Sequence, residues 1–147
     1  MDGRGKLLKS KQQADVFGRV RKAHQTEVAE DYVELIADLI AAQGEARAAD
    51  LAARLGVSHA TVTNTVQRLI GAGLVESRPY RSIFLTDAGK RLARVVRERH
   101  LIVRDFLVVI GVDAETAEND AEGIEHHVSK ETLEAFVRML RKSTSEG

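Results

Sequence analysis

The segment ARAADLAARLGVSHATVTNTVQRLIGAGLVE, residues 46–76, contains the pattern that decides the fold. Residues 48–55 are typical of a short helix, and Gly56 tolerates the left-handed conformation in which helices often end. Ser58 is a suitable N-cap for a second helix that reaches about residue 71. Two helices joined by so short a turn are predicted to form a helix-turn-helix.

The residues that follow predict a small β-wing. The stretch LVESRPYRSIFLT, residues 74–86, has two short β-prone runs, around Val75 and around residues 83–85. A turn that contains proline joins the two runs, and Arg78 and Arg81 lie near its tip. The helix-turn-helix is therefore expected to be of the winged type.

Helical patterns flank this motif on both sides. Residues 24–44 repeat apolar side chains at three- and four-residue spacing, which predicts an amphipathic helix that ends at Gly44. The same reasoning predicts three more helices: one from Asp87 to a stop at Gly111, one at about 114–127 capped by Asp113, and one at about 130–142 capped by Ser129.

These patterns together predict a mostly α fold with two domains. A winged helix-turn-helix domain with a small β-wing is expected at residues 25–92, and a helical domain at residues 93–147. Residues 1–24 form a basic N-terminal extension, for which we expect either disorder or an added helix.

The composition excludes several classes of protein. The chain has 147 residues and no cysteine, so disulfides, thiol catalysis and thiolate metal sites are excluded, and any metal would be held by carboxylates and imidazoles. No apolar run is long enough to span a bilayer, and the first residues, MDGRGKLLKSKQQ, lack the apolar core of a secretory signal. We therefore expect a cytoplasmic protein that does not enter a membrane.

The net charge is zero but unevenly distributed. Residues 1–24 and 56–104 carry +5 and +6, whereas residues 25–55 and 105–147 carry −5 and −6. A solvated mixed surface explains such blocks where no motif accompanies them. The block at 56–104 is informative because it contains the predicted recognition helix and wing.

The second helix of the motif predicts a DNA-binding face. Val62, Val66, Leu69 and Ile70 can face the core, which leaves polar side chains outside that can bond to base edges and phosphates. The helix N-terminus also favours a phosphate. Winged helices serve as protein-docking modules as well, which is the alternative. The predicted DNA-binding residues are Ser58, His59, Thr61, Thr63, Asn64, Gln67, Arg68, Arg78 and Arg81.

The segment AENDAEGIEHHVSKET, residues 117–132, concentrates acidic side chains beside two histidines. In a helix, Glu125 and His126 would each lie within about 60° of Glu122 around the helix axis, so the three would share one face. Without lysine or arginine partners one turn away, these carboxylates would repel each other unless a cation joined them. An exposed acidic face is the alternative explanation, and His127 falls off the stripe as a structural or exposed residue.

Two other places supply similar groups. Asp31 and Glu34 are three residues apart on the first predicted helix, and His100 interrupts the apolar pattern of the long helix. A lone histidine at such a position is more often a partly buried residue with a hydrogen-bond partner. Together with the acidic stripe, however, these residues would form an oxygen-rich metal site with two imidazoles.

Residues 30–140 resemble the manganese transport regulators of the diphtheria toxin repressor family. The resemblance is carried by EDYVELI, LAARLGVSHATVTNTVQRL, GLVE, FLTDAGKRLA, RERH, FLVVIGVD and DAEGIEHHVS. It implies a metal-activated repressor that binds palindromic operator DNA as a homodimer through a helical dimerisation domain. It also implies a paired metal site made by Asp31, Glu34, His100, Glu122, Glu125 and His126.

The resemblance also indicates the metal. Iron-sensing relatives carry methionine at the position of Asp31 and cysteine at that of Glu122, whereas hard carboxylates at both positions favour Mn²⁺. Two Mn²⁺ ions per subunit are expected, with Fe²⁺ or another divalent metal as the alternative. Some relatives have proline at the position of His59 and lysine at that of Asn64, so the operator sequence that is read can differ.

Two other functions are compatible with parts of the pattern. A winged-helix regulator that answers to an organic effector would leave the acidic stripe as solvated surface. A metal-dependent hydrolase would use the carboxylates and histidines to hold a metal-bound water. The sequence has no His-Glu-x-x-His helix, Gly-rich phosphate loop or nucleophile elbow, which disfavours an enzyme. An iron- or zinc-responsive regulator of the same family is the nearest alternative.

Overall fold

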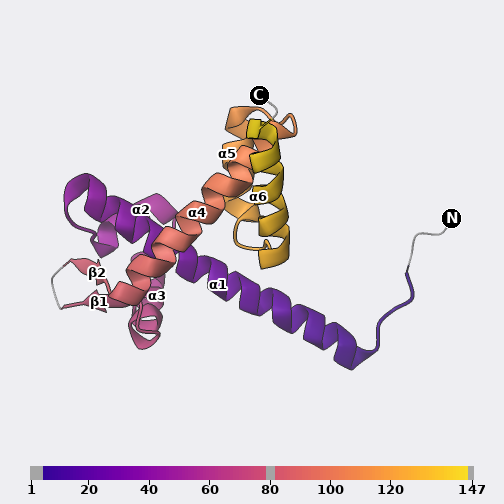
Figure 1. Cartoon of the computed structure of the whole chain (residues 1–147). Coiled ribbons are helices and arrows are strands. Elements are labelled where there is room, and N and C mark those ends of the chain that lie inside the picture. Colours follow the sequence, from indigo (N-terminus) through magenta and orange to yellow (C-terminus); the bar gives the residue numbers. More distant parts are fainter. Residues whose placement is uncertain (1–4, 79–81, 146–147) are drawn as a thin grey trace.

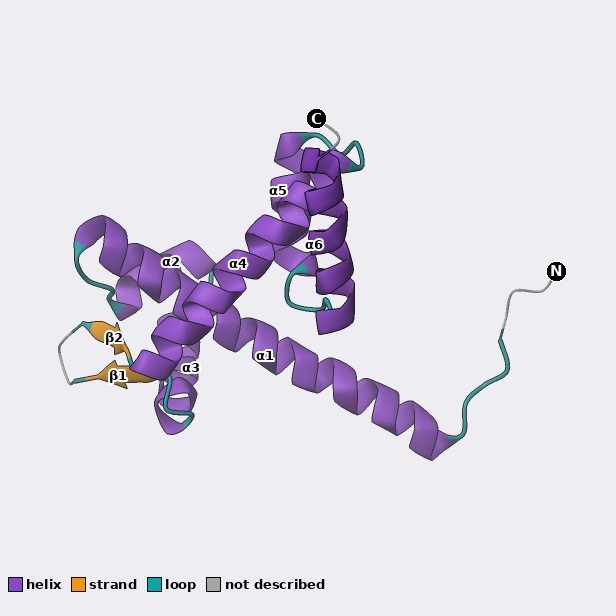
Figure 2. Ribbon diagram, in the orientation of Figure 1, coloured by secondary structure: helices purple, strands orange, loops and turns teal. Residues whose placement is uncertain are grey.

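The computed structural model describes residues 5–78 and 82–145 of the chain. Within these ranges it contains six helices and one two-stranded sheet (Figure 1; Figure 2). The elements are α1 (Ser10–Gln43), α2 (Ala48–Leu55), α3 (His59–Gly71), β1 (Val75–Ser77), β2 (Ile83–Leu85), α4 (Asp87–Val109), α5 (Ala114–Ile124) and α6 (Lys130–Ser145). The predicted mostly helical fold with a small wing is confirmed.

The helices are arranged around α1 and α4. In Figure 1, α2, α3 and the wing gather near the C-terminal half of α1, while α5 and α6 lie along the C-terminal half of α4. The N-terminal half of α1 projects away from all of these elements. Among the described residues, no helix combines the length and apolar character needed to cross a membrane.

The helix-turn-helix is held by the short-range interactions that the sequence predicts. Gly56 ends α2 with a left-handed backbone, at a φ of 68°. The Ser58 hydroxyl then accepts a hydrogen bond from the Thr61 N–H at 3.1 Å, which satisfies a free donor at the start of α3. On the inner face of α3, Val62 is completely buried, and Leu69 is 4% exposed. Both boundaries of α3 agree with the prediction.

The wing is fixed at its base. Strand β1 pairs antiparallel with β2, with Val75 opposite Leu85. The Thr86 hydroxyl donates to the carbonyl oxygen of Gly73 at 2.7 Å and accepts from the Gly89 N–H at 3.1 Å. One side chain therefore joins the end of α3 to the start of α4, with the sheet between them.

One apolar core lies under the winged helix-turn-helix, and the C-terminal half of α1 belongs to it. Val33 and Ile36 of α1 are completely buried, because their three-residue spacing puts them on one face of the helix. Leu39 continues this face one turn later. The other buried members are Tyr32, Ala46, Leu51, Val62, Val66, Leu69, Val75, Ile83, Leu85 and Ala93.

The second helical unit is assembled on α4. The rings of Phe106 in α4 and Phe136 in α6 stack with their centroids 3.9 Å apart. Asp113 caps α5 by accepting from the Thr116 N–H, and the Ser129 hydroxyl accepts from the Thr132 N–H. The predicted capping roles of Asp113 and Ser129 are thereby confirmed.

Three helix boundaries differ from the sequence-based expectations. Helix α1 begins at Ser10, so residues 10–24 of the basic extension form its first turns. Helix α6 continues to Ser145, three residues beyond the expected end. Helix α5 ends at Ile124 rather than at 127, because the His127 N–H donates to the carbonyl of Ile124 in a tighter turn.

A prediction concerns the close packing between α4 and the residue before the wing. A Cβ atom on Gly89 would overlap the carbonyl oxygen of Leu74. We expect Gly89→Ala to lower the free energy of unfolding by about 2 kcal/mol, because backbone atoms cannot move aside as a flexible side chain can. Urea denaturation monitored by circular dichroism measures this change.

The control for that experiment is Gly71→Ala. Gly71 is also helical, but a Cβ added there meets nothing within 4 Å. Its replacement should leave the stability unchanged or raise it, since alanine favours a helix over glycine. Equal effects of the two substitutions would contradict the packing argument.

Candidate metal centre and DNA-binding surface

Acidic side chains and two histidines meet where α1, α4 and the end of α5 come together. His100 faces inward because it continues the buried positions Ala93 and Val96 of α4 at helical spacing. The cluster comprises Glu27, Glu30, Asp31 and Glu34 from α1, Arg99 and His100 from α4, and Glu118, Glu122, Glu125 and His126 from α5 and the turn after it.

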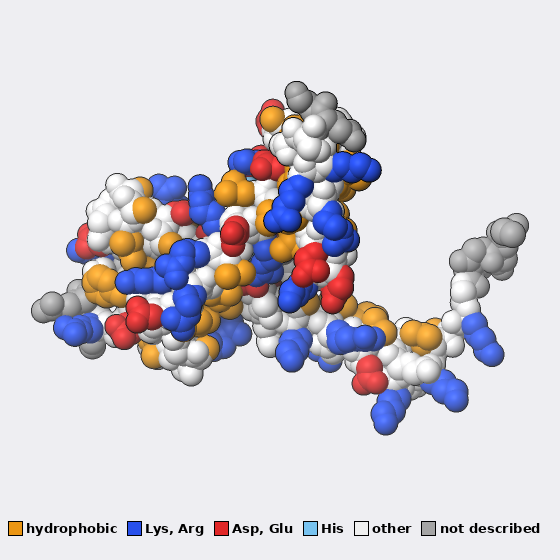
Figure 3. Space-filling view, in the orientation of Figure 1, with side chains coloured by type: hydrophobic (Ala, Val, Ile, Leu, Met, Phe, Trp, Pro, Cys, Tyr) orange, Lys and Arg blue, Asp and Glu red, His pale blue; other side chains and the backbone are white. Residues whose placement is uncertain are grey.

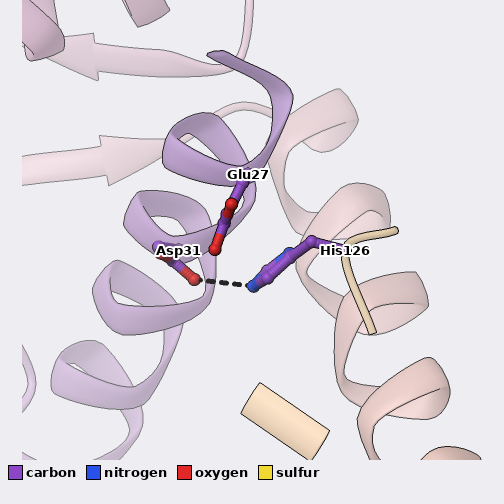
Figure 4. Close-up of side chains that lie close together, drawn as sticks. All are labelled: Glu27, Asp31 and His126. Carbon is purple, nitrogen blue, oxygen red and sulfur yellow. Dashed lines mark ion pairs between the residues drawn. The ribbon is translucent and has the colours of Figure 1, made fainter. Parts of the chain in front are cut away.

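The imidazole of His126 is held by Glu30 on one side and faces Asp31 and Glu125 on the other. Its Nδ1 lies 2.8 Å from Glu30 Oε2, and the other oxygen of Glu30 pairs with Arg99 at 2.9 Å. Its Nε2 points toward α1 and lies 2.9 Å from Asp31 Oδ1 (Figure 4). Ligand-type atoms of Glu27, Asp31 and His126 all lie within 4.8 Å of one another. We call these three residues the first group.

A second group surrounds His100. Its Nδ1 lies 2.7 Å from Glu125 Oε2 and 3.6 Å from Glu122 Oε1. Its Nε2 lies 2.8 Å from Glu118 Oε1, which orients the ring from the other side. Ligand-type atoms of His100, Glu122 and Glu125 lie within 4.8 Å of one another. A histidine that ligates a metal typically has one ring nitrogen held by a carboxylate and the other facing the metal and its remaining ligand atoms.

Two buried atoms between the groups lack hydrogen-bond partners. Within residues 5–78 and 82–145, Glu125 Oε1 and His126 Nε2 are buried without a hydrogen bond. They lie 3.3 Å apart, and the short contact of His126 Nε2 with Asp31 lacks the direction of a hydrogen bond. Buried polar atoms without partners are costly. A carboxylate oxygen and an imidazole nitrogen this close together fit a shared cation.

The crowded carboxylates shift several pKa values upward. Burial lowers the pKa of His126, but the carboxylates of Asp31 and Glu30 outweigh burial and raise this pKa to about 10. Burial raises the pKa of Glu125 to about 7, and Glu122 and other acidic neighbours add to the increase. His126 is therefore protonated at neutral pH when no metal is bound. A divalent cation would have to displace this proton in order to bind the nitrogen.

The structure brings five of the six predicted metal ligands into the two groups. Glu34 is in neither group, although it lies close enough to Glu122 for that carboxylate to raise its pKa, after the larger effect of burial. Glu34 and Glu122 line a cavity of about 420 Å³ with Asp31 and Arg54. The predicted stripe of Glu122, Glu125 and His126 needs one correction. Glu125 and His126 follow the end of α5, so a turn rather than a continuous helix presents them.

Sequence reasoning missed Glu27 and the residues that orient the histidines. Glu27 is four residues before Asp31, so the two share a helical face, and this spacing could have revealed it. Glu118 likewise precedes Glu122 by four residues. No local pattern reveals the pairing of Glu30 with Arg99, which are 69 residues apart in the chain.

The predicted recognition helix presents its polar side chains to solvent. The side chains of His59, Thr61, Thr63, Asn64, Gln67 and Arg68 all belong to exposed residues. Thr65, which was not among the predicted contacts, is buried and lies 3.5 Å from Arg68 Nη2. Arg78 is exposed at the end of β1, whereas Arg81 lies outside the described residues. Figure 3 shows several basic side chains near the wing.

A winged helix-turn-helix joined to a helical unit with a partly buried cluster of carboxylates and histidines is typical of a metal-dependent transcriptional regulator. Comparison with known families agrees with this class. The family described as "Iron dependent repressor, N-terminal DNA binding domain" matches residues 24–83, and "Iron dependent repressor, metal binding and dimerisation domain" matches residues 86–146. The chain belongs to this family of iron-dependent repressors, and the resemblance inferred from its motifs is confirmed.

Individual relatives are similar over most of the chain. "Transcriptional regulator MntR" of Escherichia coli O157:H7 is 53% identical over 136 residues, which are 92% of this chain and 88% of that protein. "HTH-type transcriptional regulator MntR" of Bacillus subtilis (strain 168) is 41% identical over 105 residues, 71% of this chain and 74% of that protein. The solved structure described as "Manganese-dependent transcriptional repressor complex with manganese" superposes with a TM-score of 0.69 at 31% identity. That superposition covers 76% of this chain and 52% of the solved one, so this chain matches about half of that longer protein.

The buried ion pair beside His126 generates a prediction about stability. Glu30→Gln removes the charge that faces Arg99, and the side chains of these two residues are only 5% and 18% exposed. We expect the metal-free protein to lose about 3 kcal/mol of unfolding free energy, because Arg99 would stay buried without its counter-charge. Urea denaturation in the presence of a chelator measures the loss.

The matched control is Glu45→Gln, which removes one partner of the exposed pair between Glu45 and Arg47. Exposed pairs contribute little, so its stability should stay close to that of the unmodified protein. If Glu30→Gln were as stable as Glu45→Gln, the buried pair would not have the structural role assigned to it.

Proposed function

We propose that the chain is a manganese-responsive repressor, which binds palindromic operator DNA as a homodimer when two Mn²⁺ ions occupy each subunit. The observation that carries this proposal is the position of Glu125. Its Oε2 faces His100 at 2.7 Å and its Oε1 faces His126 at 3.3 Å, so one buried carboxylate borders both groups. A carboxylate in this position can bridge two cations.

Each ion has its own set of donors in the proposed site. Glu27, Asp31 and His126 would hold the first ion, the histidine through Nε2, because Nδ1 of that ring already faces Glu30. Glu122, Glu125 and His100 would hold the second ion, the histidine through Nδ1, because Nε2 of that ring faces Glu118. Glu34 would add a further carboxylate from the cavity that it shares with Asp31 and Glu122.

The donor set supports Mn²⁺ as the activating metal. Carboxylates outnumber imidazoles in both groups, and the chain has no cysteine. Hard oxygen donors suit Mn²⁺, whereas thiolate and thioether ligands select softer metals. Mn²⁺ binds weakly among the divalent transition metals, so its selection depends on the number and placement of donors rather than on raw affinity.

The metal would act by tying α1 to the helical unit. Asp31 lies in α1 directly beside Tyr32 and Val33, which are buried in the core of the winged helix-turn-helix. His126 lies in the other unit, so an ion bound by both residues restricts how the two units are oriented. A dimer reads two half-sites only when its recognition helices have the spacing of successive major grooves. A metal that selects this arrangement raises operator affinity, and DNA must tighten metal binding by the same factor.

The proposed DNA contacts are of two kinds. The exposed polar side chains of α3 would read base edges, and the start of α3 would face a phosphate. The wing arginines Arg78 and Arg81 would contact phosphates or the minor groove. This function requires no catalytic step, and it operates where the chromosome lies, in the cytoplasm.

The metal proposal predicts the effect of Glu125→Gln. The amide cannot bridge two cations with charge, so this variant should bind at least one Mn²⁺ fewer per subunit and lose at least about tenfold in Mn²⁺-dependent operator affinity. Glu27→Gln should weaken the binding of only one of the two Mn²⁺ ions. Electron paramagnetic resonance of unbound Mn²⁺ counts the ions, and fluorescence anisotropy with a palindromic duplex selected in the presence of Mn²⁺ gives the affinity.

Glu98→Gln is the control, because Glu98 is exposed on α4 and outside both groups. It should bind metal and DNA as the unmodified protein does. The same anisotropy assay with Fe²⁺, Zn²⁺ and Co²⁺ under anaerobic conditions tests the choice of metal. Operator binding that no divalent metal changes would contradict the proposed function and favour an organic effector.

The DNA proposal predicts that the recognition helix and the wing behave differently. Gln67→Ala should weaken operator binding by about 1–3 kcal/mol while random DNA binds as before, because a base contact carries sequence information. Arg78→Ala should weaken operator and random DNA alike, and should lower the salt slope by about one counterion. Salt titrations of both variants on both duplexes measure the difference, and an unchanged salt slope for Arg78→Ala would remove the wing from the interface.

A further inference from the structure

The N-terminal half of α1 is a long helix without a partner in its own chain. All buried residues of α1 lie between Glu30 and Leu39, and residues 10–22 include none. Residues 10–26 form about 25 Å of helix. Figure 1 shows this part of α1 projecting away from the other helices. A helix of this length is marginal in water by itself, so its stability depends on packing against another surface.

This arm, residues 10–26 of α1, carries an exposed apolar stripe. Val16, Phe17 and Val20 are 39%, 54% and 60% exposed. Val16, Val20 and Ala23 follow one another at helical spacing, and Glu27 continues the same face. Large apolar side chains gathered on one face of a projecting helix mark a surface that another molecule covers.

The stripe leads directly into a groove beside the dimerisation domain. Glu27 borders a groove of about 550 Å³ whose other wall is formed by α5 and the turn after it. Ile124 and Val128 are its apolar residues, and Ile124 is 39% exposed. The helical face that carries the stripe therefore reaches this groove at Glu27, and α5, which forms the other wall, lies in the unit that matches the metal-binding and dimerisation domain of the family.

The charges of the two surfaces are complementary. The described part of the extension, residues 5–24, carries six basic side chains and one acidic side chain. In α5 and its N-cap, Asp113, Glu115 and Asp120 are exposed and lie outside the cluster around His100, Asp120 lines the groove, and residues 113–125 include no lysine or arginine. The arm cannot fold back onto its own α5, because α1 is one continuous helix from Ser10 to Gln43. A second copy of the chain carries the same α5.

We propose that the arm packs across the second copy of this chain, with its apolar stripe in the groove beside α5 and its basic residues against the acidic face of α5. The inference rests on the proposed homodimer and assigns the N-terminal extension to its interface. A two-fold axis would make the contact reciprocal, so each subunit gives an arm and receives one. DNA is the less suitable partner, because the stripe needs an apolar cover and Figure 1 shows the arm projecting away from the wing.

The first test measures dimerisation. Phe17→Asp combined with Val20→Asp should raise the dimer dissociation constant at least tenfold in sedimentation equilibrium with saturating Mn²⁺. Val95→Asp is the control, since Val95 is 48% exposed on α4 and should leave the dissociation constant unchanged. Mn²⁺ counting by electron paramagnetic resonance should give the same number of ions per subunit for all three proteins.

The second test uses the absence of cysteine in the natural sequence. A chain with Val20→Cys, mixed with a longer tagged chain with Ile124→Cys, should form a disulfide-linked heterodimer on mild oxidation. Val20→Cys mixed with Val95→Cys should form much less.

The possible outcomes distinguish a failure of the proposed arm contact from a failure of the proposed homodimer. An unchanged dissociation constant for the double aspartate variant, or equal cross-linking in both mixtures, would overturn the proposal. A variant that dimerises normally but shows a smaller salt slope with random DNA would place the arm on DNA instead, which would also overturn it. An unmodified protein that stays monomeric with Mn²⁺ and DNA would contradict the proposed homodimer itself.

Discussion

The burial of Glu125 between two imidazoles constrains the whole acidic cluster. A carboxylate in this position is costly unless cations or protons surround it, which is why its pKa rises to about 7. His100 and His126 face its two oxygens, and each ring is held from behind by another carboxylate, Glu118 or Glu30. His100 Nε2 and His126 Nδ1 therefore have carboxylate partners on the outside of the cluster. His100 Nδ1 and His126 Nε2 face the two oxygens of Glu125 on the inside.

The cluster also links the winged helix-turn-helix to the helical unit. Glu30 of α1 is bound both by Arg99 of α4 and by His126 after α5. Helix α1 contributes to the core beneath the recognition helix with one part of its length and to the acidic cluster with the preceding turns. A change in the charge of the cluster therefore acts directly on an element of the DNA-reading unit.

The sequence predicted the features that depend on neighbouring residues. Gly56, Ser58 and Asp113 end or begin helices through contacts within four residues, and the structure has these boundaries where the caps indicated. The burial of His100 also followed from its place in the apolar spacing of α4. Glu27 was missed although its four-residue spacing from Asp31 places the two on one helical face. The pairing of Glu30 with Arg99 could not be predicted, because it depends on how helices 69 residues apart in the chain pack together.

Helix α4 runs without interruption from Asp87, beside the wing, past His100 in the cluster, to Val109. Asp87 and His100 are thirteen residues apart, or about 20 Å along the helix. A rigid rod of this length is a lever: a tilt of about 5° at His100 moves its far end by about 2 Å. Hydrogen bonds to bases tolerate a range of only about 0.5 Å. Because α4 is this long, a small rotation at the cluster becomes a displacement beside the wing that is larger than a hydrogen bond tolerates.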